Sequence, residues 1–273
     1  MDKKKILFVS QEIAPFVQKS DISNLTRRLP QSIQEAGKDI RVFTPKFGCI
    51  NERRHQLHEV IRLSGMNIII DDKDHPLLIK VASIPSARLQ VYFIDNEEFY
   101  DRKNTLVDDE GKYYTDNDER SMFFCRGVLE TVKKLGWKPD IVYCHGWMAS
   151  LMPLYIKKMY HKDPHFSDSK IVISLYDEEI NNNWDERFAE KLKFEGFDKK
   201  IQTELTDSSY LNVMKTVIKY SDGIAMGSEN LSPEMREVFD SAACLKQDYV
   251  AEEYQTKVMS DFFDKVIEEE VLA

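Results

Sequence analysis

The stretch KILFVSQEIAPFVQKSDISNLTRRLPQSIQEAGKDIRVFTP, residues 5–45, decides the fold. Its first six residues form a short, largely apolar run, which is typical of a buried parallel strand. A helix is expected from Ser20 or Asp21, both good N-cap residues, to Gly37. DIRVFTP (39–45) predicts a second strand. Strand, helix and strand in this order form a βαβ unit, whose crossover should be right-handed.

The turn between this strand and this helix contains no glycine, since Gly37 is the first glycine of the chain. Nucleotide-binding α/β proteins usually place glycines here, because a residue without a side chain lets the backbone amides close on a phosphate. The sequence therefore predicts a nucleotide-binding topology without the residues that normally make the phosphate site.

The alternation of strands and helices continues along the chain. Four β-type segments between residues 57 and 96 predict hairpins at one edge of the sheet. Residues 97–114 are expected to be a loop, and a helix over 115–135 should open with a near capping box from Thr115 to Asp118. Further strands are expected at 139–145, 169–177 and 222–228, and further helices at 146–160, 208–221 and 232–242. The predicted fold class is α/β, a doubly wound, Rossmann-like parallel sheet with an edge of β-hairpins.

Two segments are distinguished: residues 1–245 as one Rossmann-like domain and residues 246–273 as a C-terminal helix. In that last segment Val250, Tyr254, Val258, Phe262 and Val266 recur every four residues. The stripe allows a dimer contact, but packing of the helix back onto its own domain is favoured.

Composition disfavours several classes of function. The 273 residues contain 38 Lys and Arg against 47 Asp and Glu, a net charge of −9. Bulk charge therefore disfavours binding of nucleic acid or of an anionic membrane. No apolar stretch reaches the length of a membrane span or of a signal peptide, so a cytoplasmic protein is expected. The four cysteines are scattered without a CxxC pair, and neither a metal nor a cofactor is expected.

Ligands of doubly wound sheets sit beyond the carboxyl ends of the strands. Glu12 there either orients a sugar hydroxyl or is a solvated loop acid. His145 is able to donate to a leaving group or to a sugar hydroxyl, whereas Trp147 alone is more simply a core residue. Three acids, residues 177–179, either hold sugar hydroxyls or face water. The candidate substrate-binding residues are Glu12, Gln18, Lys19, Asn117, Arg120, His145, Trp147, Tyr176 and Asp177, with His145 and Glu12 as catalytic candidates.

Several segments resemble bacterial glycogen synthases and plant starch synthases of the ADP-glucose type. They are KKILFVSQEIAPF, EAGKDIRVFTPKFG, DEGKYYTDNDERSMFFCRGVLE, PDIVYCHGWMASLMPLYIK, KIVISLY and YSDGIAMGSENLSPEMREVF. The resemblance implies one half, the N-terminal acceptor-side domain, of a glycosyltransferase B architecture. It also implies a retaining transfer of glucose to an α-1,4-glucan without metal. Glu12, Asn117, Arg120, His145 and Trp147 match family positions.

The departures from the family pattern concentrate where phosphate would bind. The family turn Lys-Thr-Gly-Gly-Leu is here QKSDI (18–22), so Ser20 and Asp21 replace both glycines. Their side chains should block the approach of the backbone to a diphosphate, and the carboxylate should repel it. Elsewhere His-Asp-Trp has become HGW (145–147), and Thr-Ile-His-Asn has become SLYD (174–177).

Three functions remain open. The first is a degenerate acceptor-side domain, without transferase activity of its own, which binds a glucan or partners a full synthase. The second is an active ADP-glucose:α-1,4-glucan glucosyltransferase that needs a second chain for the donor domain, because only one helix is expected after residue 245. The third is a non-catalytic scaffold or homodimerisation module that uses the 246–270 helix.

Overall fold

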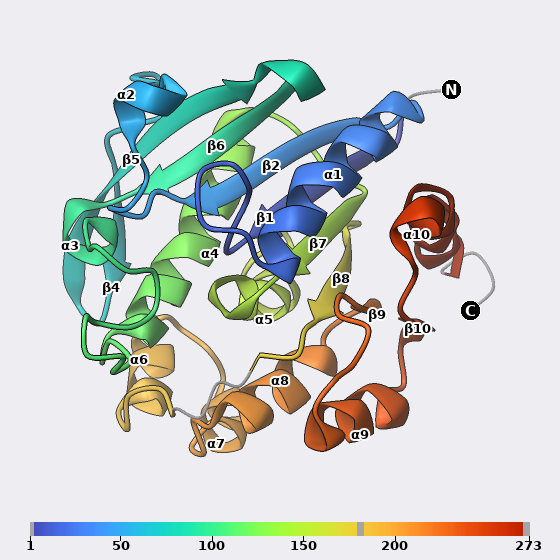
Figure 1. Cartoon of the computed structure of the whole chain (residues 1–273). Coiled ribbons are helices and arrows are strands. Elements are labelled where there is room, and N and C mark those ends of the chain that lie inside the picture. Colours follow the sequence, from blue (N-terminus) through green and yellow to red (C-terminus); the bar gives the residue numbers. More distant parts are fainter. Residues whose placement is uncertain (1–2, 179–182, 270–273) are drawn as a thin grey trace.

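The computed structural model describes residues 3–178 and 183–269, and a mixed, mostly parallel sheet forms its centre (Figure 1). Within the described residues the strand order is β10-β9-β8-β7-β1-β2-β6-β5-β3, with β4 paired to β5. β1 (Lys5–Ser10) lies between β2 (Asp39–Pro45) and β7 (Ile141–His145) and is parallel to both. The doubly wound sheet is therefore confirmed. The other strands are β3 (His58–Glu59), β4 (Met66–Ile70), β5 (Lys73–Ile84), β6 (Leu89–Asp95), β8 (Lys170–Leu175), β9 (Gly223–Met226) and β10 (Leu245–Gln247).

The edge beyond β2 carries the predicted hairpins. β5 is a long strand that runs antiparallel to β4 and to β6. The β4–β5 hairpin turns at Asp71 and Asp72, both with positive φ (45° and 63°), a region that Asp tolerates better than most residues. The turn is thus shorter than expected from the polar run 71–76, and the first β-type segment contributes only β3.

Helices cover both faces of the sheet, with α1 (Asp21–Glu35) in front and α4 (Asn117–Lys134) behind it in Figure 1. The predicted apolar face of α1, formed by Ile22, Leu25, Leu29 and Ile33, is buried. No helix in the described part of the chain combines the length and apolarity needed to cross a bilayer. The other helices are α2 (Glu52–His55), α3 (Glu97–Tyr100), α5 (Met152–Leu154), α6 (Phe188–Phe194), α7 (Lys199–Glu204), α8 (Tyr210–Ile218), α9 (Pro233–Ser241) and α10 (Glu252–Glu268).

The helix expected over 146–160 is broken. It consists of a 3-10 turn at Trp147–Ala149, the single turn of α5 and a π-helical segment at Tyr155–Met159. Pro153 lies in the first turn of α5, where its missing N–H is tolerated.

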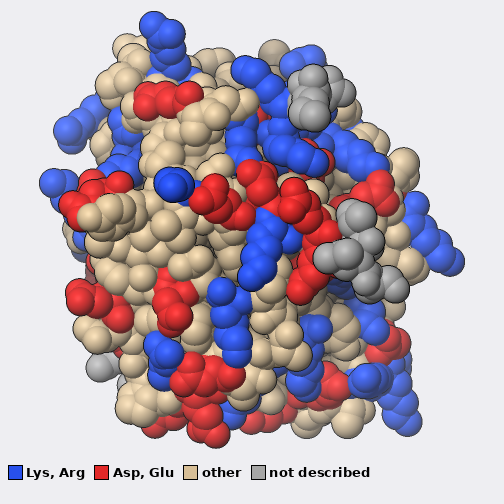
Figure 2. Space-filling view, turned by 90° about the vertical axis from the view of Figure 1, so that its right-hand side faces the viewer, with Lys and Arg blue, Asp and Glu red and all other residues tan. Residues whose placement is uncertain are grey.

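The last helix, α10, packs against its own domain. Phe263 meets the ring of Tyr143 from β7 edge-on, with ring centroids 5.1 Å apart, and Lys38 forms an ion pair of 2.6 Å with Asp264. The helix begins at Glu252 and not at residue 246, because residues 245–247 pair with β9. Its buried face also departs from the predicted stripe, since Tyr254 is 61% exposed. Acidic and basic side chains are interspersed on the face that carries α10 (Figure 2).

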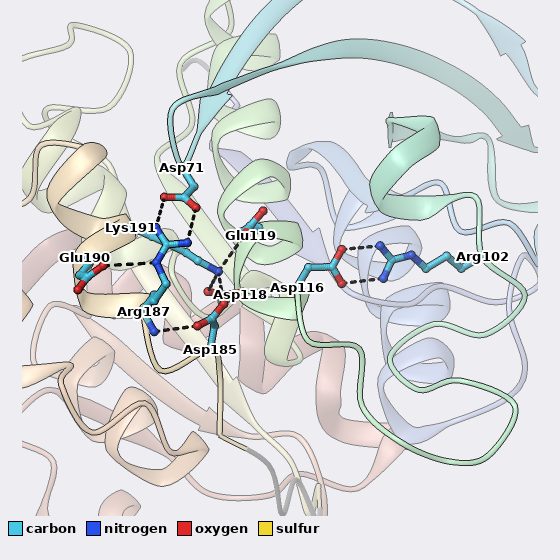
Figure 3. A network of polar contacts seen from close by, with 9 residues as sticks. All are labelled: Asp71, Arg102, Asp116, Asp118, Glu119, Asp185, Arg187, Glu190 and Lys191. Carbon is cyan, nitrogen blue, oxygen red and sulfur yellow. Dashed lines mark hydrogen bonds and ion pairs between the residues drawn. The ribbon is translucent and has the colours of Figure 1, made fainter.

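Ion pairs connect the start of α4 to the segments on either side of it (Figure 3). The helix starts at Asn117, and Asp118 forms no capping box. Instead Asp118 is fully buried and accepts a hydrogen bond from Nζ of Lys191, on α6, at 2.8 Å. Lys191 also lies 2.7 Å from Glu119 and 2.9 Å from Asp185. On the other side, Asp116 forms a bidentate pair with Arg102.

Replacement of Lys191 by methionine should lower the free energy of unfolding by about 3–5 kcal/mol, because it leaves the buried Asp118 carboxylate unpaired. Burial raises the pKa of Asp118 to about 6. The loss should therefore be larger at pH 8, where Asp118 is charged, than at pH 5, where it is mostly neutral. Urea unfolding at both pH values measures this. Lys193→Met, at an exposed position of the same helix, is the control, and equal losses in the two variants would contradict the expectation.

Candidate functional site

Four parallel strands end at the same edge of the sheet and bring distant parts of the sequence together. The register pairs Ser10 with His145, His145 with Ser174, and Ser174 with Ala225. The residues that follow β1, β7, β8 and β9 therefore lie next to one another. The nine candidate residues lie at or after these strand ends or in the first turn of α4. The structure divides them among several small groups and does not gather them in one pocket.

The turn before α1 is closed by its own side chains. Ser20 is the N-cap, with an extended backbone (φ −141°, ψ 172°) that requires no glycine. Its Oγ accepts from the backbone N–H of Ser23 at 3.0 Å, and the Oγ of Ser23 accepts from the N–H of Ser20 at 2.8 Å. The Oγ of Ser20 also donates to Oε2 of Glu12 at 2.5 Å. Side-chain oxygens thus accept from the N–H groups of Ser20 and Ser23, at the helix end where a phosphate would bind in a glycine-rich turn.

Asp21 connects α1 to two other strand ends. The hydroxyl of Ser228, which follows β9, donates to Oδ2 of Asp21 at 3.1 Å. The backbone N–H of Asp177, which follows β8, donates to Oγ of Ser228 at 3.3 Å. Asp21, which replaces the second family glycine, is therefore connected through Ser228 to the residue that follows β8. Ser228 was not anticipated from the sequence, because a single serine after a strand carries no pattern.

His145 and Tyr176 form a buried pair. The ring of His145 is fully buried and stacks on Phe8, and its Nδ1 lies 2.8 Å from the hydroxyl of Tyr176. Burial lowers the pKa of His145 to about 3, so the imidazole is neutral at physiological pH. Tyr176 packs against Gly227, where a Cβ would lie 2.4 Å from its ring.

Gln11 occupies the space beside Gly146. This glycine has a φ of +78°, and a Cβ on it would lie 2.8 Å from Cβ of Gln11. Oε1 of Gln11 accepts from the backbone N–H of Met148 at 3.1 Å and so caps the turn after β7. Sequence reasoning missed Gln11, although the glycine in place of the family aspartate was a signal that another side chain fills this position.

Asn117 and Arg120 contact each other, helix α3 and the loop that follows it. Nη1 of Arg120 donates to Oδ1 of Asn117 at 2.5 Å, and Nε donates to the carbonyl of Phe99 at 2.7 Å. Asn117 donates to the carbonyl of Leu106 at 2.9 Å. Burial lowers the pKa of Arg120 to about 10. The guanidinium lies over the rings of Phe47, Tyr100 and Tyr114.

Trp147 lies inside an aromatic cluster and is 1% exposed. Its ring stacks on Trp184 with centroids 5.6 Å apart, and Tyr113 and Tyr210 meet it edge-on. In this conformation its ring presents no open face to a ligand.

Glu12, Gln18 and Lys19 share one groove. Its volume is about 490 Å³, and it lies between the turn that precedes α1 and the loop of residues 103–111. Glu178 lies close by: burial and the charge of Glu12 raise its pKa to about 7, and the hydroxyl of Tyr210 donates to it at 3.4 Å. Of the three acids expected after β8, residue 179 lies outside the described residues.

Comparison with known proteins places this arrangement in a family. Residues 5–247 match the family described as the starch synthase catalytic domain. The chain belongs to this family. Glycogen synthase from Chlorobium limicola is 35% identical over 237 residues, which are 85% of this chain and 47% of the relative. Glycogen synthase from Pelodictyon phaeoclathratiforme is 33% identical over 259 residues, 93% of this chain and 51% of the relative. The chain spans about half the length of the curated relatives it matches.

A solved structure shares the fold of this glycogen and starch synthase family member. It is the catalytic domain of starch synthase IV from Arabidopsis thaliana bound to ADP and acarbose, with a TM-score of 0.68 and 19% sequence identity. The match covers 97% of this chain and 50% of that one. The family match and the relatives confirm the resemblance inferred from the sequence segments, and the solved structure confirms the fold as half of a starch synthase catalytic domain.

Restoring the family aspartate in Gly146→Asp should destabilise the domain by about 1–3 kcal/mol, because the new Cβ meets Gln11 and the positive φ is strained. Combining it with Gln11→Ala should give a smaller loss than the sum of the two single losses, since the introduced carboxylate then has room to cap Met148. Thermal or urea unfolding of the double-mutant cycle measures this coupling. Strict additivity would show that Gln11 and the side chain introduced at position 146 do not compete for this space.

The buried His145 should make stability depend on pH. Its native pKa of about 3 lies below the ordinary value, so the unfolded state binds the proton first as pH falls below about 6.5. His145 should therefore contribute a loss of up to about 1.4 kcal/mol per pH unit between these values. Unfolding of the wild type and of His145→Gln from pH 7.5 to 5 compares the slopes, and identical slopes would contradict a depressed pKa.

Proposed function

We propose that this glycogen/starch synthase-family glycosyltransferase domain is a pseudoenzyme that binds an α-1,4-glucan without transferring glucose to it. The observation that carries the proposal is the closed turn before α1. A diphosphate would have to displace the serine capping box, which already satisfies the N–H groups of Ser20 and Ser23, and the bond that holds the Ser20 hydroxyl on Glu12.

Charge supports the same conclusion. The carboxylates of Glu12 and Asp21 both lie at the N-terminus of α1, where the helix dipole favours negative charge. They supply that charge from within the chain, and the neighbouring Glu178 adds to it whenever it is ionised. A donor diphosphate would meet like charge at short range, which disfavours its binding.

The groove beside this turn supports glucan binding. Carboxylate, amide and hydroxyl groups from Glu12, Gln18, Asn104 and Thr105 line it, and such groups pair with sugar hydroxyls as donors and acceptors. Sugar binding does not need backbone amides at a helix end. The relatives are glycogen synthases, and the similar solved structure is bound to ADP and acarbose.

Isothermal titration of the full chain with maltoheptaose and with ADP-glucose tests both parts. Maltoheptaose should bind, whereas ADP-glucose should show a Kd weaker than about 1 mM. Absence of maltoheptaose binding would refute the glucan part. ADP-glucose binding, or incorporation of glucose into glycogen by the purified chain, would refute the proposed loss of donor binding and glucose transfer and would favour an active transferase.

The variant Ser20→Gly/Asp21→Gly tests the physical cause. Glycine at the N-cap should lower stability by only a few tenths of a kcal/mol, and glycine at position 21 by up to about 1 kcal/mol. ADP should bind more tightly than to the wild type because two side chains and one charge are gone. Ser32→Gly/Glu35→Gly, in the last turn of the same helix, is the matched control and should leave ADP affinity unchanged. No gain in the first variant would show that the turn is not what excludes the nucleotide.

A further inference from the structure

A chain of buried hydroxyl groups connects β7 to β8 and ends on His145. The hydroxyl of Tyr143 donates to Oγ of Ser174 at 3.2 Å. The hydroxyl of Ser174 also interacts with that of Tyr176, and the hydroxyl of Tyr176 lies 2.8 Å from Nδ1 of His145. All four side chains are buried. Their protons must therefore find acceptors within the chain of contacts.

Counting protons fixes the direction of these bonds. Tyr143, Ser174 and Tyr176 bring three hydroxyl protons to three contacts. If each hydroxyl donates toward His145, every hydroxyl proton has an acceptor, and the last acceptor is Nδ1. In the opposite direction Nδ1–H would donate to Tyr176, and the proton of Tyr143 would lose the acceptor it has in Ser174. Nε2 of His145 has no partner in either direction, so the direction toward His145 leaves one group of this chain of contacts unpaired and the opposite direction leaves two. Because an unpaired buried polar group is unfavourable, the direction toward His145 prevails.

We propose that Tyr176 is a positioning residue that holds His145 as the neutral tautomer with its proton on Nε2. Because Nδ1 accepts the Tyr176 hydroxyl, the single proton of the neutral ring resides on Nε2. Nε2 is buried and has no hydrogen-bond partner among residues 3–178 and 183–269. It is therefore a donor reserved for an acceptor oxygen, and His145 serves the site as a hydrogen-bond donor and not as an acid.

Packing keeps Tyr176 in this role. Its ring lies against Gly227, where even a methyl group would overlap it. Position 176 carries histidine in the family pattern, so the relay through a tyrosine hydroxyl is a feature of this chain. The tautomer follows from the contacts alone. The identification of the acceptor oxygen as a sugar hydroxyl rests on the proposed function.

NMR of the full chain labelled with ¹⁵N-histidine tests the tautomer directly. Long-range ¹H–¹⁵N correlations distinguish a ring protonated on Nε2 from one protonated on Nδ1, and the signal missing in His145→Gln assigns the residue. At pH 7 the wild type should show the Nε2–H pattern alone. A wild-type spectrum with the Nδ1–H pattern overturns the proposal without any further variant.

Tyr176→Phe tests the cause, because phenylalanine keeps the ring and removes only the hydroxyl. The single-tautomer pattern should be lost, since Nδ1 no longer has a donor. Tyr160→Phe removes a hydroxyl that donates to Glu130 and does not contact His145, so it should leave the single-tautomer pattern unchanged. An unaltered pattern in Tyr176→Phe refutes the positioning role.

Maltoheptaose added to the labelled wild type should shift the Nε2 resonance. An unshifted resonance despite bound sugar refutes a sugar hydroxyl as the acceptor and leaves both the tautomer and glucan binding intact. Absence of any sugar binding by titration instead refutes the proposed function, and the tautomer is then judged on the spectrum alone.

Discussion

The hydrogen bond from the Ser20 hydroxyl to the Glu12 carboxylate is the contact on which the character of this site depends. It joins the end of β1 to the start of α1, and Ser20 caps the helix at the same time. A helix N-terminus carries free N–H groups and a positive dipole, and it seeks an oxygen or an anion. Here both come from the chain itself. The backbone at Ser20 is extended, so the turn is stable without glycine and without a ligand.

Other replacements around the strand ends follow the same pattern, in which a side chain fills space that a glycine leaves open. Gln11 fits because residue 146 has no Cβ, and Tyr176 fits because residue 227 has none. Asp21 meets Ser228 in place of an open turn. These pairs couple changes at positions far apart in the sequence. The site is therefore packed and hydrogen-bonded in its own right, and single reversions toward the family pattern meet an occupied position.

The sequence predicted the elements whose pattern is periodic. The strands from β1 to β9 and the buried face of α1 follow from apolar runs and helical spacing, since these patterns report burial directly. Contacts between polar side chains were not predictable in the same way. A lysine such as Lys191 is expected at the surface, yet its ammonium is enclosed by three carboxylates, two from α4 and one from the turn before α6. Gln11 and Ser228 likewise act through partners that only the sheet register brings near.

The two ligands of a glycogen synthase-type site make different physical demands, and under the proposed function this difference accounts for the loss of one without the other. A diphosphate needs several backbone amides aimed at one point, so a single side chain at Ser20 or Asp21 is enough to close its site. A sugar needs only scattered donors and acceptors, which loops supply and which tolerate substitution. Glu12 illustrates the difference, because the carboxylate that we propose to exclude phosphate from α1 also lines the groove proposed for sugar. His145 fits the same logic: a neutral ring with a fixed Nε2 proton is suited to holding a hydroxyl oxygen, and its depressed pKa makes it unsuited to protonating a leaving group.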